Sequence, residues 1–412
     1  MLNLLTGNIS GNQMSEWKEC KLGDVCEFQE GYVNPSQNFS EYFDGNIKWL
    51  RATDLNNGNV YNTSRTLTEK GFLSAGKSAK LFKPNTIGIS KSGTIGRLGI
   101  LKDYMCGNRA VINIAPSEKV NTQFIYYNLL NRQDQFEHLA VGSVQKNLYV
   151  PILAELKIKL PPIQKQNEIA SKLSALDDKI ELNNQINRNL EEQAQAIFKN
   201  WFIDFEPFGG IKPEDWNEVC LKDCCSSITD GVHNTVIDDP DGDFYLLSCK
   251  NIKGGVLSIG SDERKINKET FDKLRKRTKL AKGDILLSSV GTVGEMLLLT
   301  KDPENIEFQR SVAIIKAERN LISPEFLYNS LIAQKDTIVN AAHGAVQQCI
   351  FLSDIGDFKT ILPTSEYMNK YTLLVSPYYE QISKNQDENM HLISMRDTLL
   401  PKLMSGGMEL SR

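Results

Sequence analysis

One stretch of the chain has the residue types of a phosphate-binding loop. Residues 71–78 are GFLSAGKS, which fits the pattern glycine, four residues, glycine, lysine, serine. Such a loop needs a buried strand before it and a helix that begins at the lysine, so that backbone N–H groups surround the phosphate. The polar residues TLTEK precede it instead, and Pro84 follows closely. We therefore ascribe the match to chance.

Cysteine and histidine give no pattern typical of a metal site. Cys220, Cys224 and Cys225 cluster, but no histidine follows at ligand spacing and no second cysteine pair accompanies them. The histidines lie far apart, and the chain lacks a nucleophile elbow, a helicase signature, a nuclease core and the signatures of amino-group methylation. We expect thiols, no catalytic residues, no metal and no cofactor bound by this chain.

Composition indicates a globular protein of two or three domains. The chain has 412 residues, of which 41% are hydrophobic and 24% charged. No apolar run approaches the roughly 18 residues that span a bilayer, and the opening segment lacks a basic leader, so a cytoplasmic protein without a membrane segment is expected. Met14 begins a more plausible start than Met1, which makes residues 1–15 a tail.

Charge is segregated along the chain. The net charge of −4 weighs mildly against a nucleic-acid partner. However, residues 272–284 (DKLRKRTKLAKGD) are strongly basic, whereas residues 236–244 are acidic. A local basic surface is therefore possible despite the acidic total.

The chain contains the same pattern twice. Residues 16–26 (EWKECKLGDVC) recur as residues 215–225 (DWNEVCLKDCC). Three shorter pairs follow in the same order: SKSGTIG (90–96) with SSVGTVG (288–294), NRAV (108–111) with QRSV (309–312), and GSVQ (142–145) with GAVQ (344–347). A period of about 200 residues indicates a duplicated domain. GFLSAGKS corresponds to TFDKLRKR (270–277), which keeps Phe and Lys without either glycine, so a basic turn is predicted in both copies.

A long helix is predicted at the end of each copy. Residues 163–202 contain no Gly or Pro, and a seam recurs at spacings of four and three, which is typical of a coiled coil. The seam positions are Ile169, Leu173, Leu176, Ile180, Asn183, Asn187, Leu190, Ala194, Ile197 and Trp201 in the first helix, and Tyr371, Val375, Tyr378, Ile382, Asn385, Asn389, Leu392, Arg396, Leu399 and Leu403 in the second.

The asparagines fix the register of this coil better than its direction, and connectivity favours an antiparallel pair. About 35 helical residues would make a rod of about 50 Å. The fold class expected is α+β, with two duplicated α/β domains separated by two long helices that form an antiparallel, pseudo-two-fold symmetric coiled coil. A simple dimerisation or spacer coil is equally compatible with the helices alone.

The repeated SxxGT segment predicts a strand, a tight glycine turn and a strand in each domain. Its polar residues could contact DNA phosphates, although a simple hairpin explains the glycines about as well. Arg109 and Arg310 are either ligand contacts or buried ion-pair partners. The candidate DNA contacts are Lys77, Lys80, Lys91, Ser92, Thr94, Arg97, Gln145, Lys146, Lys273, Lys276, Arg277, Lys279, Ser289, Thr292 and Gln347.

Three segments resemble one known family. They are LPPIQKQNEIASKL (160–173), AIFKNWFIDFEPF (196–208) and LLPKLMSGGM (399–408). Together with the duplication they resemble the specificity (S) subunit of a type I restriction-modification enzyme. The domains expected are target-recognition domains at 16–160 and 209–362, a central conserved helix at 161–208 and a C-terminal one at 363–412. The corresponding segment of the second copy, LPTSEYMNKYTLL (362–374), lacks one proline and the glutamine, so the starts of the two helices are not expected to be equivalent as docking sites for partner subunits.

The resemblance implies a non-catalytic subunit. Each recognition domain would recognise one half of a bipartite, asymmetric site in double-stranded DNA, and the coiled coil would set the gap. Two methyltransferase (M) subunits would dock on the coil and on the recognition domains, and would methylate adenine N6 with S-adenosylmethionine. Restriction/translocase (R) subunits would supply ATP- and Mg²⁺-dependent restriction of foreign DNA. The alternatives are a free-standing duplicated DNA-binding regulator and a nucleotide-dependent enzyme built on residues 71–78.

Overall fold

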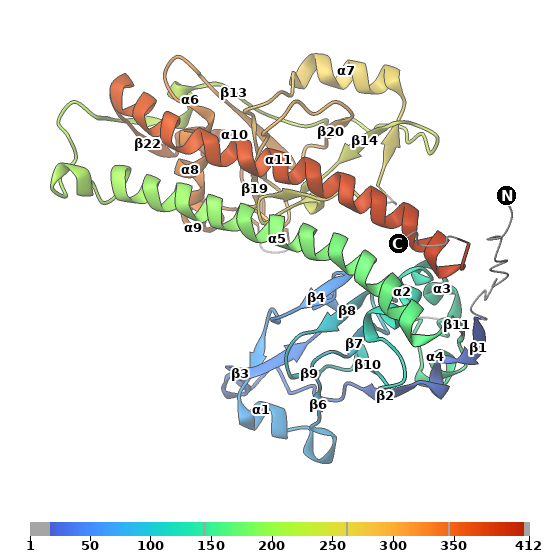
Figure 1. The fold of residues 1–412 in the computed structure, drawn as a ribbon. Helices are drawn as coiled ribbons and strands as arrows, with labels where there is room; N and C mark the ends of the chain where they lie inside the picture. The colour runs from blue at the N-terminus through green and yellow to red at the C-terminus, as the bar shows by residue number, and fades with distance from the viewer. Residues whose placement is uncertain (1–16, 143–145, 261–262, 345–346, 408–412) are drawn as a thin grey trace, which may run out of the picture. The chain divides into compact units, whose positions relative to one another are not determined.

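The computed structural model describes residues 17–142, 146–260, 263–344 and 347–407. The chain forms two compact units. Unit 1 comprises Met1–Glu181 with Met390–Arg412, and unit 2 comprises Leu182–Asn389. Each unit contains one of the duplicated domains together with a segment of both long helices (Figure 1).

The domain of unit 1 is built on two sheets. The larger has the order β2-β10-β7-β8-β4, and its pairs are antiparallel except the parallel β4–β8 pair. The second sheet has the order β5-β3-β9-β6, and β1 pairs with β11. The strands are β1 (Lys18–Lys21), β2 (Cys26–Glu30), β3 (Phe43–Leu50), β4 (Gly58–Val60), β5 (Thr66–Leu67), β6 (Leu81–Phe82), β7 (Ile87–Ser90), β8 (Leu98–Leu101), β9 (Met105–Gly107), β10 (Val111–Pro116) and β11 (Lys157–Leu160). The helices are α1 (Glu69–Leu73), α2 (Thr122–Leu130), α3 (Gln133–Leu139) and α4 (Val150–Ala154).

The domain of unit 2 repeats this plan. Its main sheet has the order β13-β21-β18-β19, which matches β2-β10-β7-β8, and its second sheet has the order β17-β14-β20. The strands are β12 (Asn217–Cys220), β13 (Cys225–Asp230), β14 (Phe244–Leu247), β15 (Ile252–Lys253), β16 (Val256–Leu257), β17 (Lys265–Ile266), β18 (Ile285–Ser288), β19 (Met296–Leu298), β20 (Ile306–Phe308), β21 (Val312–Ala317) and β22 (Lys359–Leu362). The helices are α6 (Leu221–Cys224), α7 (Lys268–Thr278), α8 (Pro324–Ala333), α9 (Lys335–Asn340) and α10 (Leu352–Asp357).

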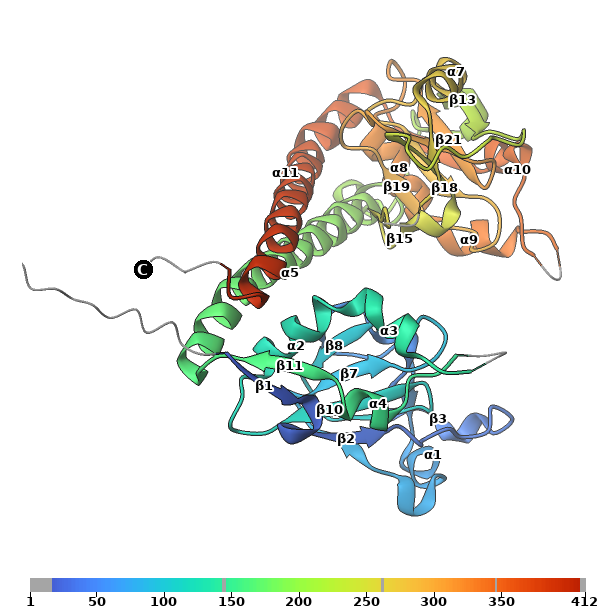
Figure 2. The ribbon, with the colours of Figure 1, turned by 90° about the vertical axis from the view of Figure 1, so that its right-hand side faces the viewer.

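Local sequence explains the helix that packs on each main sheet (Figure 2). The side chain of Asn121 caps α2 by accepting from the N–H of Phe124 at 2.9 Å. The hydroxyl of Ser323 caps α8 by accepting from the N–H of Phe326 at 3.2 Å. Phe124 and Phe326 are both fully buried in the core of their unit. The cap therefore places the first apolar residue of each helix against its sheet.

The two long helices are α5 (Ile163–Phe202) and α11 (Ser365–Met404). In unit 2, Phe198 near the end of α5 packs on Tyr371 near the start of α11, with ring centroids 6.0 Å apart. In unit 1, Leu173 near the start of α5 shares a core cluster with Leu400 near the end of α11. The early part of one helix thus packs on the late part of the other. The expected fold class, with its antiparallel coil, is confirmed.

Four buried asparagines form a polar layer in the coil of unit 2. The amide of Asn183 donates to the side-chain oxygen of Asn389 at 2.9 Å, and the amide of Asn385 donates to that of Asn187 at 2.7 Å. Each of the four is at most 8% exposed. Every seam position predicted for α5 and α11 is buried or half-buried. A charged pair also joins the helices in unit 1, where Arg396 donates to Asp177 at 2.9 Å.

The basic turn predicted at TFDKLRKR is wrong, because these residues belong to the helix α7. Asn267 caps this helix by accepting from the N–H of Thr270 at 3.0 Å, and Phe271, Leu274 and Thr278 are buried along one face. A capped, amphipathic segment forms a helix despite its charge. The corresponding residues of unit 1 form α1 and a short 3-10 helix over Gly76–Ser78.

Gly71, the first residue of the phosphate-loop pattern, lies inside α1. A Cβ at this position would lie 2.1 Å from the carbonyl oxygen of Tyr42, so close packing requires the glycine. Within the described residues, no helix is long and apolar enough to cross a membrane. The same part of the chain contains no group of three or more His, Cys, Asp or Glu that could hold a metal ion.

The asparagine layer leads to a prediction about stability. Replacing Asn187 alone with Leu should lower the free energy of unfolding by about 1–3 kcal/mol, because the buried amide of Asn385 loses its acceptor. The double variant Asn187→Leu/Asn385→Leu should regain most of this loss, because an apolar pair replaces a polar one. Denaturant unfolding of the two single variants and the double variant measures the coupling. Simple addition of the two losses would contradict the pairing.

Candidate nucleic-acid interface

Two of the duplicated loop segments, and the residues that follow the third, meet at one place in each unit. In unit 1, the hairpin loop between β7 and β8 lies beside the turn before β10, where the N–H of Lys91 donates to the carbonyl of Ala110 at 2.8 Å. The segment after α3 joins them, because the N–H of Leu148 donates to the carbonyl of Lys91 at 2.9 Å. We call these three segments (residues 91–97, 108–110 and 146–148) the three-loop site of unit 1.

The three-loop site of unit 2 (residues 289–295, 309–311 and 347–350) is built by equivalent bonds. The N–H of Ser289 donates to the carbonyl of Ser311, and that of Ile350 donates to the carbonyl of Ser289, both at 2.9 Å. The N–H of Gly291 also donates to the carbonyl of Gln348 at 2.8 Å. Two of the preserved segments and the residues after a third therefore build one common surface in each unit.

The hairpin loop of each site is braced from inside. The hydroxyl of Ser90 donates to the carbonyl of Thr94 and accepts from the N–H of Arg97, and Ser288 makes the same two bonds. Gly93 and Gly291 lie at the loop tips with φ of 77° and 83°, a backbone conformation that favours glycine. The serine and glycine of the SxxGT pattern thus shape the loop, while the residues between them can vary.

The predicted contacts of the hairpin and third loop differ in their exposure. Thr94, Arg97 and Lys146 are exposed in unit 1, as are Thr292 and Gln347 in unit 2, whereas Ser92 is half-buried. Gln145 lies outside the described residues.

Two of the contacts predicted in the three-loop sites already have partners inside the protein. The ammonium group of Lys91 pairs with Glu30 at 3.0 Å, and the Lys91 side chain is only 15% exposed. Ser289 is buried, and its hydroxyl donates to the carbonyl of Arg310 at 3.5 Å. The backbone positions of both residues shape the site more directly than their side chains.

The charged residues of the basic helix α7 fall into two groups, those that bond to other parts of the domain and those that are only exposed. The guanidinium of Arg277 donates to the carbonyl of Asp230 at 2.8 Å and to that of Gly231. Arg275 pairs with the buried Glu307, whose pKa is raised by burial against the opposing effect of that guanidinium. Lys273, Lys276 and Lys279 are exposed. The arginines therefore fasten the helix, and the lysines form a basic face.

Lys77 and Lys80 lie elsewhere in unit 1. Both are exposed, in and just after the short 3-10 helix over Gly76–Ser78. Among the described residues, no contact joins either lysine to the three-loop site. Both precede β6, a strand of the smaller sheet.

Arg109 and Arg310 are the residues whose role the sequence left open. Both are exposed, and neither has an ion-pair partner in the part of the chain that the structure describes. The buried alternative is therefore wrong. One signal could have found them: no other charged residue recurs at a matched position in both copies of the three short motifs.

Glu295 occupies the position of Arg97 in unit 2, and groups of the same unit compensate its negative charge. Glu295 pairs with Lys335 at 2.7 Å and accepts from the N–H of Gly254 at 2.6 Å. Burial alone would raise the pKa of Glu295, but the Lys335 ammonium and the Gly254 N–H hold it below its usual value. An exposed cation in one domain thus corresponds to an internal ion pair in the other.

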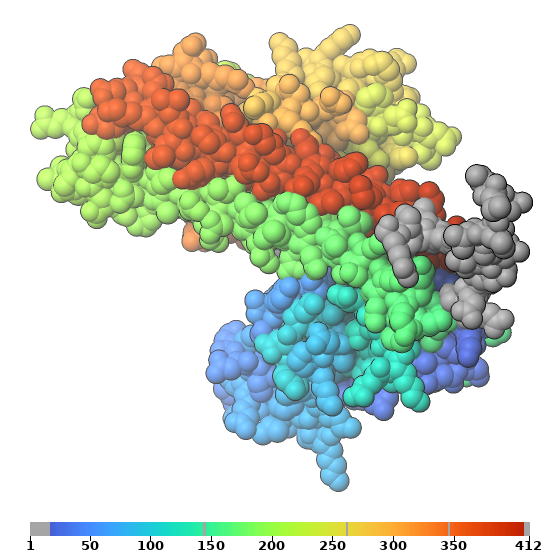
Figure 3. Space-filling view, in the orientation of Figure 1, coloured from blue at the N-terminus to red at the C-terminus, as the bar shows by residue number. Residues whose placement is uncertain are grey.

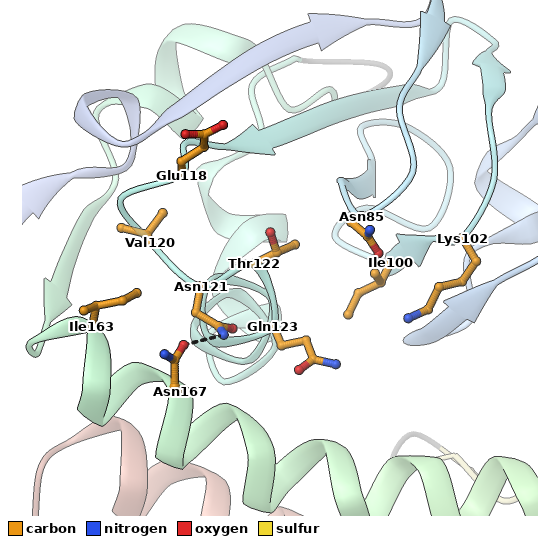
Figure 4. A pocket seen from close by; sticks show the side chains of 10 residues that line it. All are labelled: Asn85, Ile100, Lys102, Glu118, Val120, Asn121, Thr122, Gln123, Ile163 and Asn167. Carbon is orange, nitrogen blue, oxygen red and sulfur yellow. Dashed lines mark hydrogen bonds between the residues drawn. The ribbon is translucent and has the colours of Figure 1, made fainter.

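A cavity of about 480 Å³ lies elsewhere in unit 1, between the start of α2 and the start of α5 (Figure 4). Lys102, Glu118 and Ile163 are among the residues that line it, and the amide of Asn121 donates to Asn167, a further lining residue, at 2.8 Å. None of the predicted DNA contacts lines this cavity.

Comparison with known proteins identifies the family. The sequence profile of the type I restriction modification DNA specificity domain matches residues 14–192 and 213–388. The chain belongs to this family, and its duplicated domains account for the two matches.

Individual relatives extend this similarity over nearly the whole chain. The type I restriction enzyme MjaIX specificity subunit of Methanocaldococcus jannaschii is 29% identical, covering 96% of this chain and 94% of that protein. The HindI specificity subunit of Haemophilus influenzae is 24% identical, covering 95% of this chain and 100% of that protein. A crystal structure of the S subunit of a type I restriction-modification system from M. genitalium has the same fold, with a TM-score of 0.53 at 18% identity, covering 97% of this chain and 98% of that one.

The division of charges on α7 can be tested by a matched pair of variants. Arg277→Ala should lower the free energy of unfolding of the domain by about 1 kcal/mol, because two backbone carbonyls lose a donor that is partly exposed to solvent. Lys276→Ala, its exposed neighbour, should change stability by less than about 0.5 kcal/mol. Denaturant unfolding compares the two, and equal losses would contradict a structural role for Arg277.

Proposed function

We propose that this chain is the non-catalytic, sequence-recognising subunit of a type I restriction-modification complex. Each duplicated domain recognises one half of a bipartite, asymmetric site in double-stranded DNA. The observation that supports this most directly is the pair of three-loop sites, which share one backbone design but expose different side chains. Lys146 in unit 1, for example, corresponds to Gln348 in unit 2. Two related surfaces with different chemistry suit two different half-sites.

The coiled coil sets the length of the unspecified gap between the half-sites. Both helices run for 40 residues without interruption, and the asparagine pairs favour a single register. On this proposal residues 16–160 and 209–362 are the recognition domains, and residues 161–208 and 363–412 are the conserved helices.

The uncovered face of the helices is where two methyltransferase subunits dock. Figure 3 shows the outer faces of α5 and α11 open to solvent in each unit. These helices expose apolar side chains, which mark interaction surfaces: Leu182 (49%), Ile186 (37%), Leu373 (78%), Met390 (53%) and Ile393 (39%).

The partner subunits supply the chemistry. The methyltransferase subunits bring S-adenosylmethionine and receive the target adenine in their own pocket once it is flipped out of the duplex. Restriction subunits bring ATP- and Mg²⁺-dependent translocation and cleavage of foreign DNA. The assembly would work in the cytoplasm, where it meets that DNA.

Exchange of one domain tests whether each domain recognises its half-site independently of the other. The chain is co-expressed with its methyltransferase partner in a methylation-free host, and N6-methyladenine is mapped across the genome. Wild type should methylate one split motif that requires both proteins. Replacing residues 16–160 with the first domain of another family member should change one half of that motif, and a changed second half would contradict the proposal. Absence of any complex between the two proteins would favour the free-standing regulator.

Lengthening the coil tests its role as the spacer. Adding seven residues to α5 after Ile180 and seven to α11 before Leu392 keeps the asparagine pairs matched. The insertion extends the coil by about 10 Å, so the gap should grow by about three base pairs. The seven-residue insertion in α5 alone should abolish methylation, because the asparagine layer and the seam positions before Ile180 can then no longer both be in register with α11. The same methylation map measures both variants, and an unchanged gap in the matched variant would refute the spacer.

A further inference from the structure

We propose that Arg109 and Arg310 hold the DNA backbone at the same place in each recognition domain, whereas Lys146 and Gln348, in the third loop of the same sites, contact bases. The three-loop site thereby separates affinity from specificity. This inference rests on the proposed function and assigns roles within it.

The arginines stand on fixed backbone but have free side chains. In unit 2, the N–H of Arg310 donates to the carbonyl of Val232 at 3.0 Å, and the carbonyl of Arg310 accepts from Ser289. In unit 1, the residue before Arg109 is held on both sides: the N–H of Asn108 donates to the carbonyl of Leu50 at 3.0 Å, and its side-chain oxygen accepts from the N–H of Ala110 at 3.0 Å. Both guanidinium groups are therefore exposed to solvent on backbone that hydrogen bonds hold in place.

Comparison of the two duplicated domains distinguishes residues that contact phosphate from residues that contact bases. Two domains that recognise different half-sites must differ at positions that contact bases and can agree at positions that contact phosphate. Among the described residues of the two sites, the exposed side chains that agree, apart from the glycines at the loop tips, are those of the two arginines and of Thr94 and Thr292. The exposed pair Lys146 and Gln348 differs.

The chemistry of the shared residues fits a phosphate. A guanidinium has donors in a planar fork that matches two phosphate oxygens, and it stays charged at every physiological pH. A threonine hydroxyl adds a neutral donor. The residues that differ, a lysine and a glutamine, have the hydrogen-bonding groups that distinguish guanine from adenine in the major groove.

The experiment compares variants in the complex with the methyltransferase subunit. Arg109→Ala and Arg310→Ala should each weaken binding by the same factor on the target duplex and on an unrelated duplex, and each should reduce the slope of log affinity against log salt by about one. The methylated motif should keep both halves. Lys146→Gln should change bases in one half of the motif, and Gln348→Lys should change bases in the other.

Lys119→Ala is the matched control, because Lys119 is exposed beyond the opposite end of β10 from Arg109. It should leave both the salt slope and the motif unchanged. A changed motif with Arg109→Ala, or unchanged affinity for unrelated DNA, would overturn the assignment. If wild type methylates no split motif, the proposed function fails instead. Unfolding curves and complex formation equal to wild type exclude loss of folding as the cause of either effect.

Discussion

Pairing of buried amides in the coil is the constraint on which the other elements depend. An amide that loses its partner away from water costs more than an ordinary hydrogen bond contributes, so the helices have one favourable register. The pairs Asn183 with Asn389 and Asn187 with Asn385 satisfy that register. The aromatic residues of α5 and α11 then form one core with the domain of unit 2, where the rings of Phe202 and Phe326 lie 4.7 Å apart. Helix register and domain packing are therefore set together.

Within each domain, buried polar groups likewise fix the shape of the three-loop site. Ser90 and Ser288 are fully buried and brace their loops from inside, so the loop shape does not depend on the residues at its tip. The side chains that face solvent are then free to differ between domains. A fixed scaffold with exchangeable surface residues is what two half-sites of different sequence require.

The architecture could be predicted because it follows from periodic patterns. A spacing of four and three identified α5 and α11, and repeated short motifs identified the duplication and the hairpins. The exposure of single residues could not be predicted in this way. Ser289 and Thr292 belong to the same motif, yet Ser289 is buried and Thr292 is exposed, because the neighbouring turn and third loop both bond to Ser289. Arg277 and Lys276 are neighbours of the same charge, and the helical turn alone decides which one meets the sheet.

Glu295 shows how far the surface can change while the fold stays constant. A carboxylate at the position of Arg97 would repel DNA if it stood free. Its pairing with Lys335 and with the N–H of Gly254 neutralises it within the protein and joins the hairpin loop to α9 and to the β15–β16 turn. The domain of unit 2 therefore loses one exposed cation beside the loop and gains an internal connection. Exposed Lys273, Lys276 and Lys279 on and just after α7 supply positive charge to the same domain, so the two domains distribute their charge differently over one common frame.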